Sequence, residues 1–238
     1  MPFLNDLKRF YGTGEKNRAG QSLEEFLDAY DPKKYDCPSN TTDIAVVRCK
    51  RKLERWGQPL ELLLIRRGNH PSIGFWALPG GFVELKEDLE AGARRELEEE
   101  TGVKGLPLQQ LRTWGAYDRD PRWRVITTSF LALAEGELAV RAGDDAADAL
   151  WMEVGLSKAE SGDGREVWEL DLKNQAHGIS LYAKAAVTFD ACGILPQERY
   201  ELLDCRGLAV DHGLIIVQAL LYLKERLDTV SYTHLTLP

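Results

Sequence analysis

Short apolar runs, each about the length of a β-strand, are spaced along most of this chain. They occupy residues 42–48, 60–66, 75–78, 111–114, 124–133, 150–154 and 167–172, and residues 178–190 also fit a strand. The strongest helical pattern covers residues 88–101, in the middle of this series. Strands interleaved with a central helix favour a mixed α/β fold over an all-α or all-β one.

Three further segments show helical patterns. Residues 22–30 begin with Ser22 as an N-cap, and Glu25 stands three positions later as its capping-box partner. Residues 197–203 predict a short helix. Residues 211–227 repeat apolar side chains at helical spacing and end in charged ones, which predicts an amphipathic helix packed on the body of the protein.

These patterns divide the chain into parts. Residues 1–35 are polar and charged and form an N-terminal extension with one short helix. Residues 36–160 carry most strands and the strongest helix, and we expect them to form the main domain. Residues 161–229 follow as a C-terminal segment of strand and helix. The chain contains no internal repeat and no low-complexity linker.

The last nine residues, VSYTHLTLP, differ in origin from the rest in our interpretation. They match the translation of a transposase mosaic-end adaptor used in preparing sequencing libraries. We therefore expect residues 230–238 to be a non-native, adaptor-derived tail and the natural chain to be truncated before it. The alternative is a genuine apolar C-terminus.

Composition and charge narrow the classes of partner. The chain has 30 Lys and Arg against 38 Asp and Glu, a net charge of -8, so we do not expect nucleic acid as a partner unless a local basic patch exists. No apolar run approaches the roughly 20 residues of a membrane helix. The N-terminus lacks a secretory signal, so we expect a cytoplasmic protein. Its widely spaced cysteines are expected to be reduced thiols: Cys37, Cys49, Cys192 and Cys205.

The helix predicted at residues 88–101 has a favourable beginning. Glu87 and Asp88 place negative charge at its positive end, and Asp88 can cap it. Gly102 provides a left-handed stop. Apolar residues recur every four positions and predict a narrow buried stripe of Leu89, Ala93 and Leu97.

The end of the same helix is crowded with negative charge. Glu96, Glu98, Glu99 and Glu100 occupy its last turns, where the helix dipole favours cations. Like-charge pairs at this spacing cost a few tenths of a kcal/mol each, on the order of 0.2–0.5. A bound Mg²⁺ or Mn²⁺ removes this cost, and the glycines in residues 79–81 let a backbone carbonyl approach the ion. The alternative is a solvated acidic helix face.

The whole segment 81–103 resembles the signature of the Nudix family. That signature is Gly, five residues, Glu, seven residues, Arg-Glu, an apolar residue, one residue, Glu-Glu, one residue, Gly and an apolar residue. Every fixed position is met, by Gly81, Glu87, Arg95, Glu96, Leu97, Glu99, Glu100, Gly102 and Val103. The resemblance implies a Nudix fold, an α/β/α arrangement in which a mixed β-sheet is sandwiched between helices, with residues 36–160 as the Nudix domain.

The resemblance also assigns expected roles within the box. The implied metal ligands are Glu96, Glu99 and Glu100, helped by a main-chain carbonyl near Gly80. Arg95 and Glu87 are implied to interact and hold the loop and helix in register. The metal would neutralise a pyrophosphate and lower the pKa of the attacking water. Glu99 is our first choice to orient or deprotonate that water; alternatively, all three glutamates act only as ligands.

Segments outside the box are similar to ADP-ribose pyrophosphatases and to Nudix-related transcriptional regulators of NAD metabolism. The similarity covers roughly residues 20–225, including the segments 65–84, 119–122 and 208–220. It implies a nucleoside diphosphate linked to another group as substrate, ADP-ribose being favoured. The arginines that could contact its phosphates are Arg66, Arg67, Arg119 and Arg122, with Arg67, Arg119 and Arg122 preferred. Aromatic residues that could stack on an adenine, or lie in the core, are Trp76, Trp114, Tyr117 and Trp123.

One position departs from the simplest nucleotide-cleansing members of the family. They carry a glutamate directly before a Trp-Met pair, where this chain has Leu150 before Trp151 and Met152. Candidate replacements, unless they form a solvated loop, are Asp144, Asp145 and Asp148. The histidines His70 and His212 are interpreted as structural or surface residues.

The sequence alone therefore leaves two candidate functions. The favoured one is a metal-dependent pyrophosphohydrolase, because the box is intact. The other is a regulator whose Nudix domain senses such a metabolite, a class that often has an eroded box and needs a DNA-binding domain. Family resemblance also implies a homodimer.

Overall fold

The computed structural model of the chain describes residues 3–143, 146–162, 164–190 and 197–235. It divides into two units, Met1–Cys37 and Pro38–Pro238. The first unit contains the short 3-10 helix η1 (Lys8–Phe10) and helix α1 (Leu23–Ala29). The predicted capping box is confirmed, because Ser22 and Glu25 exchange hydrogen bonds between side chain and backbone at 2.7 and 3.3 Å.

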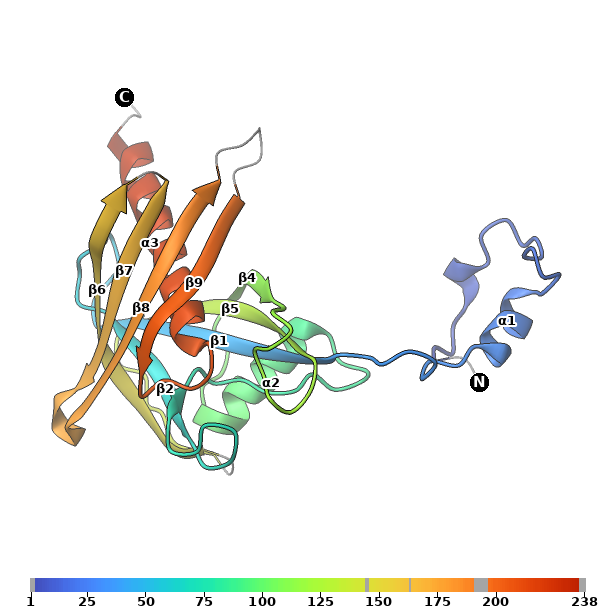
Figure 1. Cartoon of the computed structure of the whole chain (residues 1–238), viewed down its shortest axis with the longest axis horizontal. Helices are drawn as coiled ribbons and strands as arrows, with labels where there is room; N and C mark the ends of the chain where they lie inside the picture. Colours follow the sequence, from blue (N-terminus) through green and yellow to red (C-terminus); the bar gives the residue numbers. More distant parts are fainter. Residues whose placement is uncertain (1–2, 144–145, 163, 191–196, 236–238) are drawn as a thin grey trace. The chain divides into compact units, whose positions relative to one another are not determined.

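The second unit is built on one mixed sheet (Figure 1), in which the strand order is β4-β5-β1-β2-β6-β7-β8-β9 and β3 pairs with β2. β1 and β5 are parallel, and the other pairs are antiparallel. The strands are β1 (Ser39–Cys49), β2 (Glu61–Arg67), β3 (Trp76–Ala77), β4 (Leu108–Trp114), β5 (Val125–Glu135), β6 (Ala146–Gly162), β7 (Arg165–Asn174), β8 (Ile179–Asp190) and β9 (Gln197–Arg206). Every predicted strand is present.

Two helices, α2 (Leu89–Thr101) and α3 (His212–Leu235), cover the sheet on opposite faces. The buried residues of β1 alternate between two core clusters, as successive side chains of a strand must. Ile44 and Val46 pack in the cluster that contains α2, whereas Ala45 and Val47 pack in the cluster that contains α3. This alternation confirms the predicted α/β/α sandwich.

The sheet extends further than the apolar pattern predicts. β6 was expected only at residues 150–154, but its polar second half continues to Gly162 by pairing with β7. It therefore runs across residue 160, the expected domain boundary, and the structure keeps everything from Pro38 onward in one unit. Figure 1 shows β6, β7, β8 and β9 running side by side, with α3 next to them.

The helix predicted at residues 197–203 is wrong, because this segment belongs to strand β9. β9 pairs along β8, and its burial alternates: Tyr200 and Leu202 are half-buried, whereas Arg199 and Glu201 are exposed. Its Glu and Leu residues favour a helix only locally. Pairing with β8 supplies backbone hydrogen bonds and a surface to pack on, and these override the local preference.

Helix α3 begins where expected but continues past residue 227 to Leu235, into the segment expected to be adaptor-derived. None of the helices in the described residues has the length and apolarity needed to span a membrane. Cys37, Cys49 and Cys205 are free thiols, as predicted, and Cys192 lies outside the described residues.

Candidate functional site

A glycine loop links β3 to helix α2 and is fastened to β1. The Thr42 N–H donates to the Gly81 carbonyl, and the Ile44 N–H donates to the Pro79 carbonyl, each at 2.9 Å. Gly80 has a φ of 154°, and a Cβ there would lie 1.9 Å from the Thr42 carbonyl oxygen. The loop can approach β1 this closely only because position 80 has no side chain.

The neighbouring glycine makes room for a carboxylate. A Cβ on Gly81 would lie 2.5 Å from Oε2 of Glu96. The Glu96 carboxylate therefore rests directly against the glycine backbone. The first fixed position of the box is thus required by the position of the first of its clustered glutamates.

The beginning of α2 is stabilised by Glu87 rather than by Asp88. Asp88 occupies the N-cap position, but its side chain makes no capping hydrogen bond. Glu87 instead accepts the Glu84 N–H at 3.1 Å and pairs with Arg95 through both carboxylate oxygens at 3.0 Å. The Arg95 hydrogen bonds are the main cause that lowers the pKa of Glu87.

The predicted apolar stripe of α2 is shorter than expected. Ala93 and Leu97 are buried, but Leu89 is exposed, so the expectation for Leu89 is wrong. The first turn of the helix lies beyond the edge of the core cluster that contains Ala93 and Leu97. Gly102 ends the helix in the left-handed conformation, as predicted.

Arg95 compensates much of the negative charge at the end of α2. Its Nη1 donates to Glu96 at 2.8 Å and to Glu99 at 3.0 Å, and Lys104 pairs with Glu98 at 2.5 Å. Three of the four crowded glutamates thus have a cationic partner. The expected electrostatic cost without metal is therefore smaller than the bare sequence implies, and it is concentrated in Glu100.

Glu100 has the least compensated charge of the group. Its carboxylate accepts the Gly80 N–H at 2.8 Å, and no ion pair to it is found within the described residues. Burial is the largest cause that raises its pKa to about 8, and the charges of Glu96 and Asp43 add to this effect. Burial also raises the pKa of Glu96. Two adjacent carboxylates that resist ionisation suit a divalent cation, which would supply the missing positive charge.

Glu99 is arranged differently from its two neighbours. More than half of its side chain is exposed (58%), and it pairs with Arg95. Accordingly, no cluster of three or more His, Cys, Asp or Glu residues close enough to hold a metal exists in the described part of the chain. Glu96 and Glu100 are the two of the four clustered glutamates that line the pocket described next, and Glu99 would join them only by leaving Arg95.

A pocket of about 330 Å³ lies beside these carboxylates. Glu96, Glu100 and Gly80 line it, and so do all three preferred substrate arginines, Arg67, Arg119 and Arg122. Arg66 is not part of its lining in the described structure. The strands, the glycine loop, the loop between β4 and β5, and the start of α3 all contribute residues. Other lining residues are Thr41, Asp43, Phe82, Asp120 and His212.

The three arginines differ in how far they are committed to protein partners. Arg119 is almost fully buried and forms a bidentate ion pair with Asp211 at 2.8 and 2.9 Å. Arg122 is half-exposed and pairs with Asp120 at 2.8 Å. Arg67 donates to the Pro71 carbonyl at 2.8 Å. Arg122 is the most exposed of the three but is itself held by two hydrogen bonds to Asp120, whereas Arg67 makes no ion pair within the described residues. Arg119 mainly holds the pocket wall.

The aromatic residue at the pocket is one that the sequence did not single out. Phe82 lines the pocket, and the Arg122 guanidinium lies over its ring, 5.3 Å from the ring centre. Trp76 and Trp114 are core residues, and Tyr117 and Trp123 are exposed outside the lining. The available signal in the sequence was the position of Phe82 directly after Gly80 and Gly81, the second of which opens the box.

Of the expected acidic replacements near Trp151, only Asp148 lies within the described residues. Asp148 accepts the N–H of its neighbour Ala149 at 2.9 Å and does not line the pocket. Asp144 and Asp145 lie outside the described residues.

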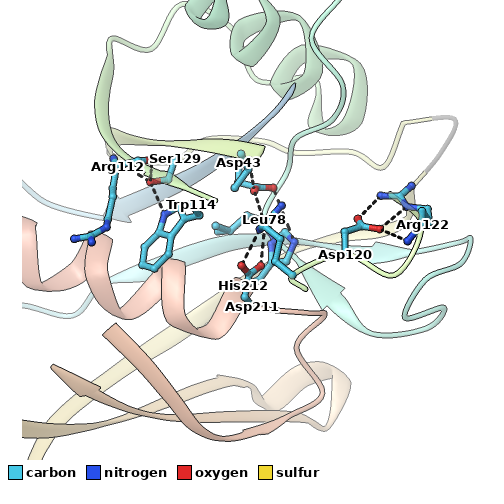
Figure 2. A network of polar contacts seen from close by, with 11 residues as sticks. Asp43, Leu78, Arg112, Trp114, Asp120, Arg122, Ser129, Asp211 and His212 are labelled. Atoms are coloured by element: carbon cyan, nitrogen blue, oxygen red, sulfur yellow. Dashed lines mark hydrogen bonds and ion pairs between the residues drawn. The ribbon is translucent and has the colours of Figure 1, made fainter. Parts of the chain in front are cut away.

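A buried polar network that includes Asp43 and His212 lines part of the pocket (Figure 2). Asp43 accepts the Thr127 hydroxyl at 2.7 Å, and the His212 Nε2 lies 3.9 Å from Asp43. His212 Nδ1 accepts the Leu78 N–H at 3.0 Å. His212 is buried, as a structural histidine should be, but it also contacts Leu78 at the start of the glycine loop, which the sequence did not reveal. The signal for Asp43 was a carboxylate inside an otherwise apolar run.

The comparisons with known proteins agree on one family. The model of the NUDIX domain matches residues 41–167. The chain is 40% identical over 114 residues to the ADPR responsive transcriptional repressor NtrR of Acinetobacter baylyi, covering 47% of this chain and 43% of the repressor. It is 44% identical over 95 residues to an ADP-ribose pyrophosphatase of Methanocaldococcus jannaschii, covering 40% of this chain and 55% of that protein. The match thus spans about half the length of each of these two relatives.

Two solved structures that resemble most of the chain are a MutT/nudix family protein from Enterococcus faecalis, with a TM-score of 0.62, 31% identity and coverage of 86% of this chain and 70% of that one, and a NUDIX domain from Shewanella oneidensis. The second is the NUDIX domain of NrtR in complex with ADP ribose, with a TM-score of 0.56 and 25% identity. The likeness covers 85% of this chain and 99% of that one. It therefore extends well beyond the residues matched by the family model.

Proposed function

Because the chain belongs to the NUDIX family, we propose that it hydrolyses the pyrophosphate bond of a nucleoside diphosphate linked to a second group, ADP-ribose being the favoured substrate. One observation carries this proposal: Glu96 and Glu100 border the same pocket as Arg67, Arg119 and Arg122. A diphosphate needs a cation site and additional positive charge within one cavity, and this pocket offers both.

Nudix hydrolases generally use a divalent metal. The residues that would hold it here are Glu96, Glu100 and the Gly80 carbonyl, with Glu99 as a further ligand; Mg²⁺ or Mn²⁺ suits these oxygen donors. When bound, such an ion neutralises phosphate charge and lowers the pKa of the attacking water.

The remaining roles fall to residues of this chain. Arg95 and Glu87 hold the glycine loop against α2, since Arg95 also donates to the Phe82 carbonyl at 3.0 Å. Arg122 and Arg67 would bind phosphate oxygens, and Phe82 offers a flat apolar surface to a base. Glu99, exposed and close to the other two glutamates, is the first candidate to accept the proton of the attacking water.

The choice of ADP-ribose rests on the relatives. One is an ADP-ribose pyrophosphatase, one a repressor responsive to ADPR, and one was solved with ADP ribose bound. The repressor supports a second candidate, a metabolite-sensing regulator of NAD metabolism. The intact box with its paired Arg95 and Glu87 favours hydrolysis over sensing alone. Cytoplasmic location, homodimeric assembly and the absence of a nucleic-acid partner remain predictions.

A hydrolysis screen separates the two candidates. ADP-ribose, NADH, dinucleoside polyphosphates and oxidised nucleoside triphosphates are incubated with protein and Mg²⁺ or Mn²⁺. We expect AMP and ribose phosphate from ADP-ribose, and we expect Glu99→Gln to abolish turnover while the melting temperature is unchanged. Binding of ADP-ribose without release of any phosphate-bearing product would favour the regulator.

A further inference from the structure

The segment that leads into α3 packs along β3, the strand that precedes the glycine loop. The Trp76 N–H donates to the Gly207 carbonyl at 2.9 Å, and the Ala209 N–H donates to the Trp76 carbonyl at 2.8 Å. A parallel bridge joins Trp76 to Leu208. These contacts come from residues beyond 167, where the match to the family model ends. The loop is thus supported by a part of the chain that lies outside the match to the NUDIX family model.

His212 makes the contact nearest to the glycines. Its Nδ1 accepts the Leu78 N–H at 3.0 Å, and both residues are buried. Because Nδ1 is the acceptor, the proton of the neutral ring stands on Nε2, which faces Asp43 at 3.9 Å. The His212 side chain therefore accepts the backbone N–H of Leu78, in place of the carbonyl that a neighbouring strand would offer.

The backbone from Leu78 to Gly80 links the His212 contact to the carboxylates. Leu78 precedes Pro79, whose carbonyl accepts the Ile44 N–H, and Gly80, whose N–H binds Glu100 at 2.8 Å. A shift of Leu78 would move the Gly80 amide and carbonyl together. We propose that His212 is a positioning residue, which holds the Gly80 backbone where the metal site needs it; this rests on the proposed function.

The backbone of His212 is held independently of its side chain. Its N–H donates to the Ala209 carbonyl at 3.0 Å, and Asp211 is fixed by the two hydrogen bonds from Arg119. Asp211 also accepts the first N–H groups of α3, from Leu214 and Ile215. A change confined to the His212 side chain therefore removes the contact to Leu78 and leaves the start of the helix anchored.

Three substitutions of His212 distinguish the role of its hydrogen-bond acceptor from that of its aromatic ring. His212→Phe keeps an aromatic ring and loses every acceptor. His212→Asn places an amide oxygen near the position of Nδ1, whereas His212→Gln places its amide nearer to Nε2. We expect Mn²⁺ affinity, measured by calorimetry without substrate, to fall about tenfold or more in the Phe and Gln variants and to stay within about threefold of wild type in the Asn variant.

Gln218 is the matched control on the same helix. It is buried like His212, and its Oε1 has no hydrogen-bond partner within the described residues. Gln218→Leu should retain wild-type Mn²⁺ affinity and wild-type kcat. The same variants are assayed for turnover, where loss of positioning should lower kcat and raise the Mn²⁺ concentration needed for half activation more than it raises KM for ADP-ribose.

Equal Mn²⁺ affinity in wild type and His212→Phe would overturn the inference. If the Phe variant does not fold, equal affinities in the Asn and Gln variants overturn it instead. A wild type that binds Mn²⁺ but leaves ADP-ribose intact contradicts the proposed function alone. A wild type without Mn²⁺ affinity contradicts both.

Discussion

Glu87 and Glu100 flank the same helix, one just before its first turn and one in its last. Both belong to the box, and both lie near the glycine loop, yet their surroundings are opposite. Glu87 is held by the Arg95 fork and the Glu84 N–H, and its pKa is lowered. Glu100 is half-buried and accepts the Gly80 N–H, and the loss of solvent around it raises its pKa to about 8. The same type of side chain thus stabilises the fold at the start of the helix and is available to bind a cation at its end.

This contrast explains why a stable helix can end in a cluster of carboxylates. Arg95 reaches from Glu87 to Glu96 and Glu99, so one guanidinium stabilises the loop and offsets part of the cluster. Both Glu96 and Glu100 line the pocket, and Arg95 pairs with Glu96 but not with Glu100. Glu100 is therefore the lining carboxylate whose charge a metal would chiefly compensate.

Replacing each glutamate by glutamine should separate the two roles most strongly. Glu100→Gln should lower kcat/KM by about 10³-fold, because a metal ligand is lost, while the metal-free protein melts at the same or a higher temperature at pH 8. Glu87→Gln should lower the melting temperature and retain far more activity than Glu100→Gln. Both are read from steady-state kinetics and thermal melts. The comparison fails if Glu100→Gln destabilises the metal-free protein and Glu87→Gln does not.

Gly81→Ala tests the close contact between the loop and Glu96. The new Cβ would lie 2.5 Å from the carboxylate, which must move. Because the obstructing atoms are the flexible end of a side chain, we expect the melting temperature to change little, whereas Mn²⁺ affinity and kcat should each fall about tenfold. A variant with full activity would show that the position of the Glu96 carboxylate is not critical.

The pH dependence of stability should have opposite signs for the two glutamates. The pKa of Glu100 rises from its ordinary 4.5 to about 8 on folding, so the metal-free folded state binds an extra proton between these values. Its contribution is present below pH 4.5 and is lost as the pH rises toward 8. Glu87 has a lowered pKa, so its contribution is present above its ordinary value and is lost as acid protonates it.

Denaturant melts of metal-free protein from pH 4 to 9 check this expectation. Wild type should lose stability from pH 5 to 8, and Glu100→Gln should flatten that slope without changing the loss in acid. A slope that persists in Glu100→Gln would assign the titration to another group.

The sequence predicted the local parts of the site and missed the long-range ones. The box fixes which glutamates share a helix face, because that depends only on helical spacing. Neither Asp43 nor His212 could be placed at the loop, since their contacts join segments far apart in the chain. β9 was missed for the same reason: its pairing with β8 outweighs a helical composition. Arg119 lines the pocket, and its predicted contact with substrate phosphates stays a prediction; its partner Asp211 could not be foreseen.

The central claim is that Glu100 is left protonated by the protein so that a divalent cation can displace its proton. Calorimetric titration of metal-free protein with Mn²⁺ near pH 7, in two buffers of different ionisation enthalpy, measures the protons released. We predict release of roughly one proton per ion in wild type, and both weaker binding and little release in Glu100→Gln. Equal affinity in both proteins, with no proton released by either, would contradict the account.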